Sequence, residues 1–338
     1  MKAIQIPERG VLKVVDIERP VCHDGEVMLK IKYVGFCGSD LNTYRGANGM
    51  AKAMVIPGHE IGAEIVETGA GVPESLQQGM TVTVNPYTNC GYCSACRNRR
   101  YNACEHNETL GVQRDGAMRE FLVVPWQKVI PVEGISARHC AIIEPMSVGF
   151  HAVQRACVTD TDTVMVIGCG MVGIGAIVRS IVRGATVIAC DIDDEKLENV
   201  KQLGAAHTIN TVKEDLHERL LTITKGRMPD VVIEAVGSPF TQNQALHEVG
   251  FTGRIVFIGY SKKETSFDTG LIVKKELDIR GSRNAQPEDF EGVIKYLSRG
   301  TCPYDLLISK VVKPEEAADA MAEWSADPGK VFRILVEF

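Results

Sequence analysis

The hydrophobic and polar positions of the chain change their rhythm near residue 163. Before that point, short apolar runs are broken by Gly, Pro and Asn, a pattern that predicts a domain dominated by β-strands. The clearest of these runs lie at residues 27–34, 61–67, 80–84 and 121–124. We therefore expect a β-rich first domain that extends to residue 146.

From residue 163 onward, apolar runs alternate with longer helical patterns. The strand-like runs are residues 163–168, 186–190, 230–237 and 253–259, and the helical patterns are residues 171–183 and 193–204. Near-continuous apolar strands separated by helices predict an α/β domain with a parallel sheet covered on both faces. After residue 280 the pattern predicts a helix at 287–298 and a closing strand at 331–338, so we expect the chain to return to the first domain. The predicted domains are 1–146 with 291–338, and 147–290.

Composition and charge exclude several classes of protein. The 338 residues are 45% hydrophobic and 24% charged, as in an average globular protein. A net charge of -6 without a long Lys/Arg run argues against a nucleic-acid partner. The longest apolar run, 164–178, is too short for a membrane span, and the N-terminus lacks the apolar core of a secretory signal. We expect a cytoplasmic protein without a membrane partner.

A glycine-rich string follows the apolar run at 163–168. Gly168 permits a tight turn, Gly170 lets the backbone approach a pyrophosphate, and Gly173 lets helix and strand pack closely. This G-x-G-x-x-G string opens a helical pattern, which makes it a candidate dinucleotide-binding loop that Met171 and Val172 complete. The alternative is that the glycines only relieve helix packing.

An acid ends the next apolar run, at Asp191. A carboxylate at this place can accept hydrogen bonds from the adenosine ribose, and its charge repels a 2′-phosphate. NAD is therefore favoured over NADP. The alternative is that Asp191 is a solvated strand end.

Four of the 11 cysteines crowd into one short segment. Their spacing, C-x2-C-x2-C-x7-C, suits one tetrahedral zinc with zinc–sulfur distances of about 2.3 Å. A shell of four thiolates leaves no position for substrate, so we expect a structural site in a lobe at residues 88–106. An iron–sulfur cluster and a nucleic-acid zinc ribbon are the alternatives. The four predicted ligands are Cys90, Cys93, Cys96 and Cys104.

A second metal site is predicted from three separated residues. Cys37 and His59 are each weak signals alone, because a single Cys or His is more often a packed core residue. Glu144 lies in an otherwise apolar stretch, where burial is costly unless the carboxylate is paired or bound to metal. Together the three leave one zinc coordination position open, and zinc lowers the pKa of bound water from about 15.7 to about 7.

The succession CGSD, GHE, four cysteines, IEP and G-x-G-x-x-G resembles the zinc-dependent medium-chain alcohol dehydrogenases. It resembles their polyol, threonine and sugar-acid branch, because Glu144 stands where other branches carry a cysteine ligand. The resemblance implies a GroES-like β domain and a Rossmann domain, two zinc ions per chain, NAD as cofactor, and a homodimer or homotetramer.

The resemblance also implies roles for individual residues. Cys37, His59 and Glu144 would hold the catalytic zinc, with Glu60 as a neighbour that binds in place of Glu144 or of a water. Ser39 would bind the substrate hydroxyl and begin its proton relay. Family members often carry a histidine three residues later, where this chain has Asn42, which cannot titrate. Tyr44 is a candidate substitute, or a packing aromatic, and Asp191 and Lys196 would hold the adenosine ribose.

Residues 274–290 resemble the members that oxidise C5 of hexonates such as L-galactonate, L-gulonate or L-idonate. Arg283 presents a bidentate fork suited to a substrate carboxylate. Its alternatives are a surface salt bridge and a contact to the nicotinamide end of the cofactor. The predicted function is the NAD-linked oxidation of a secondary alcohol of such a sugar acid. The rivals are a polyol dehydrogenase, an L-threonine 3-dehydrogenase and a non-catalytic NAD-binding protein.

Overall fold

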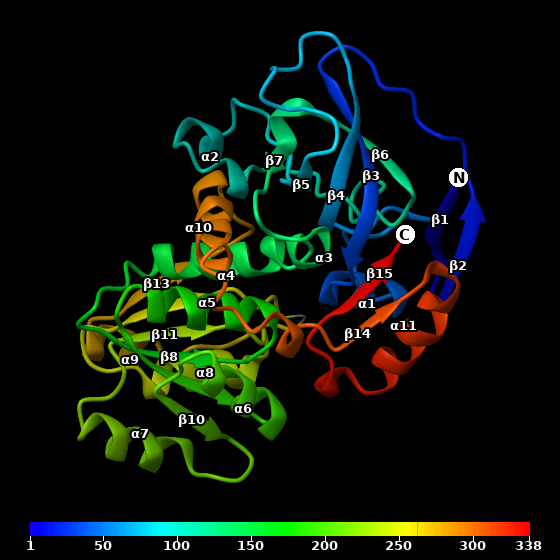
Figure 1. Ribbon diagram of the computed structural model, residues 1–338. Coiled ribbons are helices and arrows are strands. Elements are labelled where there is room, and N and C mark those ends of the chain that lie inside the picture. Colours follow the sequence, from blue (N-terminus) through cyan, green and yellow to red (C-terminus); the bar gives the residue numbers. More distant parts are fainter. Residues whose placement is uncertain (262) are drawn as a thin grey trace. The chain divides into compact units, whose positions relative to one another are not determined.

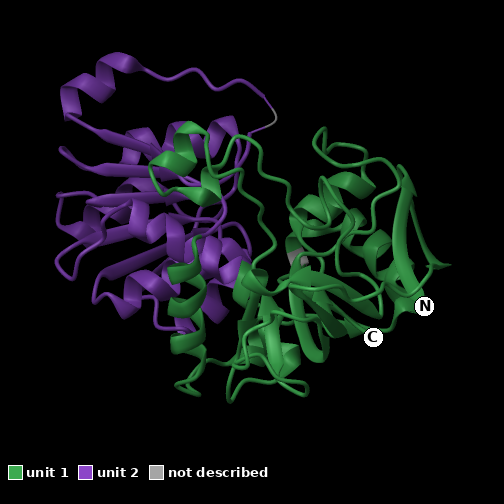
Figure 2. Ribbon diagram, turned by 90° about the horizontal axis from the view of Figure 1, so that it is seen from above, with its two compact units in different colours: residues 1–144, 286–338 green, residues 145–285 purple. Residues whose placement is uncertain are grey.

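The structure is a computed structural model that describes residues 1–261 and 263–338. The chain forms two compact units, residues 1–144 with 286–338 and residues 145–285 (Figure 2). The expected domain boundaries lay at 146/147 and 290/291. Within the described ranges, no helix combines the length and the apolar character needed to cross a bilayer.

The first unit is built on a seven-stranded sheet in the order β14-β15-β3-β4-β5-β7, with β6 paired to β3. Its strands are β3 (Glu26–Gly35), β4 (Glu60–Thr68), β5 (Thr81–Val84), β6 (Phe121–Pro125), β7 (Val129–Pro131), β14 (Lys310–Val312) and β15 (Ile334–Glu337). A separate hairpin pairs β1 (Lys2–Glu8) with β2 (Val11–Asp16). The GroES-like β domain that the sequence predicts is confirmed.

Helices of the first unit are short, apart from three of ten residues or more. They are α1 (Gly38–Tyr44), α2 (Ser94–Arg97), α3 (Ala137–Cys140), α4 (Ile143–Arg155), α10 (Pro287–Leu297) and α11 (Ala317–Ala326). Helix α4 begins in this unit and continues into the second. The 3₁₀ helices are η1 (Tyr101–Ala103), η2 (Trp126–Lys128), η3 (Tyr304–Leu306), η4 (Pro314–Glu316) and η5 (Pro328–Lys330).

Strand β3 forms the centre of the first core. Most apolar side chains of β3 and β4 are fully buried, and α11 adds Met321 and Trp324 to the same cluster. The two strands pair antiparallel, so that Gly35 at the end of β3 faces Glu60 at the start of β4. This register brings the residues that follow β3 next to those that precede β4.

The second unit holds a six-stranded parallel sheet in the order β10-β9-β8-β11-β12-β13 (Figure 1). Its strands are β8 (Thr163–Ile167), β9 (Thr186–Asp191), β10 (His207–Asn210), β11 (Val231–Glu234), β12 (Arg254–Phe257) and β13 (Asp278–Gly281). Its helices are α5 (Met171–Val182), α6 (Asp194–Gln202), α7 (Leu216–Thr224), α8 (Pro239–Glu248) and α9 (Thr269–Lys275).

Both faces of this parallel sheet are covered. Successive strand side chains point to opposite faces, and neighbouring residues of β8 such as Met165 and Val166 are both fully buried. One face packs on Leu220 of α7 and Leu246 of α8. The doubly wound Rossmann arrangement that the alternating pattern predicts is therefore confirmed.

Candidate metal sites and cofactor loop

The junctions around β3 and β4 hold the first candidate metal site. Cys37 is the extended N-cap residue of α1, and its backbone N–H donates to Asp40 Oδ2 at 2.8 Å. His59 follows Gly58, whose φ of +102° an L side chain rarely adopts. The pairing of Gly35 with Glu60 brings the segment after β3, with Cys37, next to the segment before β4, with His59. As a result, one atom each of Cys37, His59 and Glu60 lies within 4.8 Å of the other two.

Two of the three side chains, His59 and Glu60, are buried and keep donor atoms without hydrogen-bond partners among the described residues. His59 is 5% exposed and Glu60 is fully buried. Among the described residues, His59 Nδ1 and both Glu60 carboxylate oxygens have no hydrogen-bond partner, although Glu60 Oε2 forms an ion pair with Arg333 Nε at 3.1 Å. Unpaired buried polar atoms are costly. A bound cation would remove that cost.

Electrostatics also favours a cation here. Burial raises the pKa of Glu60 to about 7, against the opposing effect of Arg333 and His59. Burial acts to lower the pKa of His59, but the facing Cys37 sulfur and the Glu144 carboxylate outweigh it and raise that pKa well above its usual value. Sulfur, nitrogen and oxygen donors in one converging group are a ligand set that zinc accepts. The residues therefore fit a zinc ion.

Glu144 is placed differently from Glu60. It lies in the first turn of α4, is 3% exposed, and accepts a hydrogen bond from the Tyr87 hydroxyl. It is not among the three residues whose ligand atoms converge. The structure thus groups Glu60, which the sequence analysis held as the alternative, with Cys37 and His59.

Helix α1 carries the other residues predicted near this site. Ser39 Oγ is buried and has no hydrogen-bond partner in the described part of the chain. Asn42 and Tyr44 are half-buried on the same helix. Tyr44 packs against the hydrophobic core of the first unit, which agrees with its interpretation as a packing aromatic.

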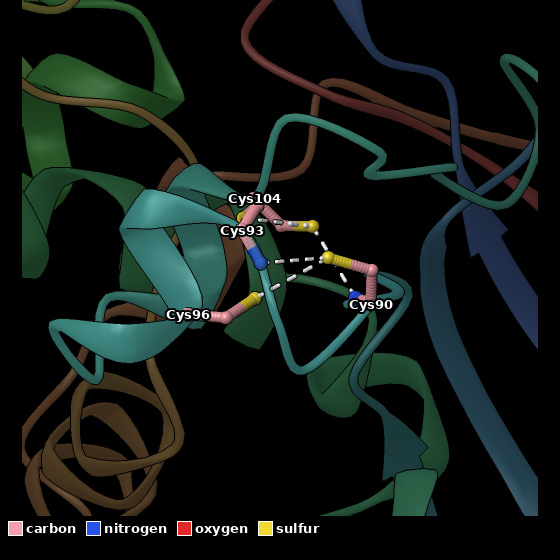
Figure 3. A group of neighbouring side chains, drawn as sticks. All are labelled: Cys90, Cys93, Cys96 and Cys104. Carbon is pink, nitrogen blue, oxygen red and sulfur yellow. Dashed lines mark hydrogen bonds between the residues drawn. The ribbon is translucent and has the colours of Figure 1, made fainter.

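The four cysteines converge as the spacing predicts (Figure 3). The Sγ atoms of Cys90 and Cys96 are 4.0 Å apart, and those of Cys93 and Cys104 are 3.8 Å apart. A tetrahedron with zinc–sulfur distances of about 2.3 Å has sulfur–sulfur edges of about 3.8 Å. These separations fit a closed zinc site and are far longer than a disulfide bond of about 2.05 Å.

Backbone groups donate hydrogen bonds to sulfurs of this cluster, those of Cys104 and Cys93 among them. The backbone N–H groups of Cys90 and His106 each donate to Cys104 Sγ at 3.3 Å. Hydrogen bonds from the backbone of Cys96 and Glu105 lower the pKa of Cys93 to about 6. Thiolate is the form that binds metal, so these donors favour the bound state.

The glycine-rich loop has the geometry expected of it. Gly168 has a φ of +96° directly after β8, and Gly170 is the N-cap of α5, which Met171 and Val172 begin. A Cβ placed on Gly173 would overlap the carbonyl oxygen of Gly168. This position therefore requires glycine for close packing of helix and loop.

Asp191 ends β9 and is fixed by backbone donors. Its Oδ2 accepts from the N–H of Cys169 at 2.7 Å, and its Oδ1 accepts from Ile192 at 2.8 Å. Lys196 lies in the first turn of α6, capped by Asp193 at 2.9 Å. The acid is thus held beside the glycine loop, at the carboxyl edge of the sheet where nucleotides bind in such folds.

Arg283 lies just after β13, the edge strand of the parallel sheet, and is half-buried. The carboxyl ends of parallel strands are where ligands bind in open α/β sheets. This placement is compatible with a ligand contact, either to substrate or to cofactor.

Two residues that contact acids of the candidate metal site, Arg333 and Tyr87, have no counterpart in the sequence analysis. Arg333, directly before β15, forms the ion pair with Glu60. Tyr87, in the loop after β5, forms the hydrogen bond to Glu144. Neither lies in a motif with a recognisable spacing. The sequence indicates such residues only indirectly: an acid in an apolar stretch, such as Glu144, requires a buried partner, but the pattern does not identify it.

Comparisons with known proteins agree with this arrangement. Residues 23–134 match the alcohol dehydrogenase GroES-like domain, and residues 172–299 match the zinc-binding dehydrogenase domain. The chain is 34% identical to L-galactonate-5-dehydrogenase of Escherichia coli K12, covering 86% of each protein. It is 32% identical to sorbitol dehydrogenase of Bacillus subtilis 168, covering 99% of this chain and 97% of that one.

A solved structure resembles the whole chain. The alcohol dehydrogenase RspB from E. coli CFT073, complexed with NADH, is 31% identical with a TM-score of 0.91, covering 100% of this chain and 99% of that one. Family domains, full-length relatives and fold all agree. The chain therefore belongs to the zinc-type medium-chain alcohol dehydrogenases, oxidoreductases that act on CH–OH groups.

Proposed function

We propose that this enzyme oxidises a secondary alcohol of a sugar acid, the C5 hydroxyl of a hexonate such as L-galactonate, L-gulonate or L-idonate. The net reaction converts the alcohol and NAD⁺ to the ketone, NADH and a proton. The observation that carries the chemistry is the group of half-buried Cys37 with buried His59 and Glu60, whose donor atoms converge. His59 and Glu60 keep unsatisfied atoms in it.

Cys37, His59 and Glu60 would hold the catalytic zinc, and the four cysteines of the lobe would hold a second, structural ion. When bound, zinc supplies a Lewis acid that makes a neighbouring hydroxyl more acidic. Ser39 lies two residues after Cys37, and its buried Oγ has no partner among the described residues. It would accept the hydroxyl proton of the substrate and pass its own onward. Asn42 cannot titrate, so the next acceptor would be water or the cofactor ribose.

The proposal of NAD rather than NADP rests on Asp191. Backbone donors fix its carboxylate at the end of β9, so its negative charge would oppose a 2′-phosphate. Gly168, Gly170 and Gly173 would receive the pyrophosphate, and Lys196 would assist at the ribose. The NADH complex of the similar RspB structure supports this choice.

The sugar-acid substrate is supported by the relative named L-galactonate-5-dehydrogenase. Arg283 would bind the substrate carboxylate with its guanidinium fork. The second candidate is a polyol without a carboxylate, which the similarity to sorbitol dehydrogenase supports at nearly the same identity. L-threonine 3-dehydrogenase activity is a further candidate, and the same experiment measures it.

The proposal is tested by measuring NADH formation by the zinc-loaded enzyme with hexonates, with the matched polyols and with L-threonine as substrates. A hexonate should give the highest kcat/KM. The variant Arg283→Met should lose about tenfold or more on the hexonate, because a charged hydrogen bond contributes about 1.5–3 kcal/mol, and should change little on the matched polyol. Turnover of polyols alone would keep the dehydrogenase chemistry and refute the sugar-acid assignment.

A further inference from the structure

Two buried carboxylates lie at the candidate metal site, and each is held by a different neighbour. Glu60 forms an ion pair with Arg333 and still converges with Cys37 and His59. Glu144 accepts a hydrogen bond from Tyr87 and does not converge with them. The two acids therefore differ in what restrains them, although both are almost completely buried.

Tyr87 is itself held from several sides. Its backbone N–H donates to Asn85 Oδ1 at 3.1 Å, and its carbonyl accepts from Lys128 Nζ at 2.6 Å. Its ring packs edge-to-face on Phe290, with centroids 6.5 Å apart. A side chain that is only 5% exposed and fixed at backbone and ring has little freedom to follow Glu144 if that carboxylate moves.

We propose that Tyr87 is a positioning residue of the metal centre, and that its hydroxyl holds Glu144 outside the ligand group of Cys37, His59 and Glu60. The inference rests on the proposed zinc-dependent function. A hydroxyl that donates to a carboxylate forms one of the stronger hydrogen bonds, and breaking it in a buried site is costly. The bond leaves three protein ligands and one open position, the arrangement of a catalytic zinc.

The variant Tyr87→Phe tests this directly, because it removes the hydroxyl and keeps the ring on Phe290. Without the Tyr87 hydroxyl bond, the Glu144 carboxylate should enter the ligand group. The matched control is Tyr33→Phe, which removes a tyrosine hydroxyl that bonds to Glu337 at 3.1 Å in the same unit. All variants are stripped of metal with a chelator and reloaded with Co²⁺.

Two readouts besides turnover distinguish a positioning role from a merely structural one. In Tyr87→Phe, an added ligand should weaken the visible d–d absorption of Co²⁺, and chelator competition should show a change of about tenfold towards tighter binding. Tyr33→Phe should match the wild type in both. The four-cysteine site contributes equally to every spectrum and cancels in the differences.

The double variant Tyr87→Phe/Glu144→Gln should recover the wild-type spectrum, because the amide is a poor ligand. An unchanged spectrum in Tyr87→Phe, or weaker cobalt binding by it, would overturn the role of Tyr87 and leave the proposed function intact. A spectrum already altered by Glu144→Gln alone would make Glu144 a ligand and also overturn the inference. Wild-type protein that binds cobalt only at the cysteines would overturn both proposals.

Discussion

Arg333 Nε lies 3.1 Å from Glu60 Oε2, and the two side chains are 6% and 0% exposed. The guanidinium also donates through Nη1 to the carbonyl oxygen of Phe36, directly before Cys37. One arginine therefore contacts both segments that form the candidate metal site, the one after β3 and the one before β4. It offsets the charge of one carboxylate, while Glu144 and Asp40 remain as further buried acids.

Replacing Arg333 by Met should destabilise the metal-free protein. The change leaves Glu60 buried without its charge partner, which costs about 3–5 kcal/mol in such pairs. Denaturant unfolding of chelator-treated protein measures the loss. The double variant Arg333→Met/Glu60→Gln should recover most of it, and a loss below about 1 kcal/mol in the single variant would refute the importance of the pair.

Gly35→Ala should weaken zinc binding while the protein stays folded. A Cβ at this position would overlap the Glu60 carboxylate and push it away from Cys37 and His59. The matched control is Gly38→Ala, because nothing lies within 4 Å of a Cβ built there. Chelator competition should show a loss of about tenfold or more for Gly35→Ala only. Equal affinities in the two variants would show that Glu60 does not bind the metal.

Cys96→Ala should remove one zinc per chain and lower stability, with turnover per folded molecule retained. Structural zinc sites contribute directly to folding, so the loss should reach several kcal/mol. The control is Cys157→Ala, which changes an exposed cysteine outside the lobe. Metal analysis and thermal unfolding measure both effects. Full stability with one zinc fewer would show that the lobe does not depend on the ion.

Asp191→Ala should relax the preference for NAD over NADP by about tenfold or more, the equivalent of about 1.4 kcal/mol. The reason is the loss of a fixed negative charge at the place of the ribose 2′-hydroxyl. Glu195→Ala, an exposed acid in the first turn of α6, removes the same charge from the same region. The ratio of kcat/KM for the two cofactors should change in the first variant and stay constant in the second. A constant ratio in both would remove Asp191 from the ribose contact.

Local patterns predicted most of the fold. In the parallel-sheet unit, β8, β9, β11 and β12 were predictable because each is a near-continuous apolar run, and β9 and α5 match their predicted ranges to within a residue or two. Strands β10 and β13 and the β1–β2 hairpin were missed, since short or polar strands give no such run, and helices α7, α8 and α9 were not predicted either. The four cysteines were predictable because all their spacings are local.

The third member of the converging group, Glu60, could not be predicted in the same way. Glu60 and Glu144 are both acids in apolar surroundings, so residue type does not separate them. The separation comes from the antiparallel register that sets Gly35 opposite Glu60, and from Tyr87, which lies 57 positions before Glu144. Such contacts depend on tertiary packing and leave no periodic trace in the sequence.

The most direct test of the account is the zinc content and NADH formation of His59→Ala beside the wild type, with NADH binding measured in parallel. We predict two zinc ions per chain in the wild type, and one zinc ion, intact NADH binding and no turnover in the variant. Two zinc ions in the variant, or turnover equal to that of the wild type, would contradict the claim that the group of Cys37, His59 and Glu60 holds the catalytic metal.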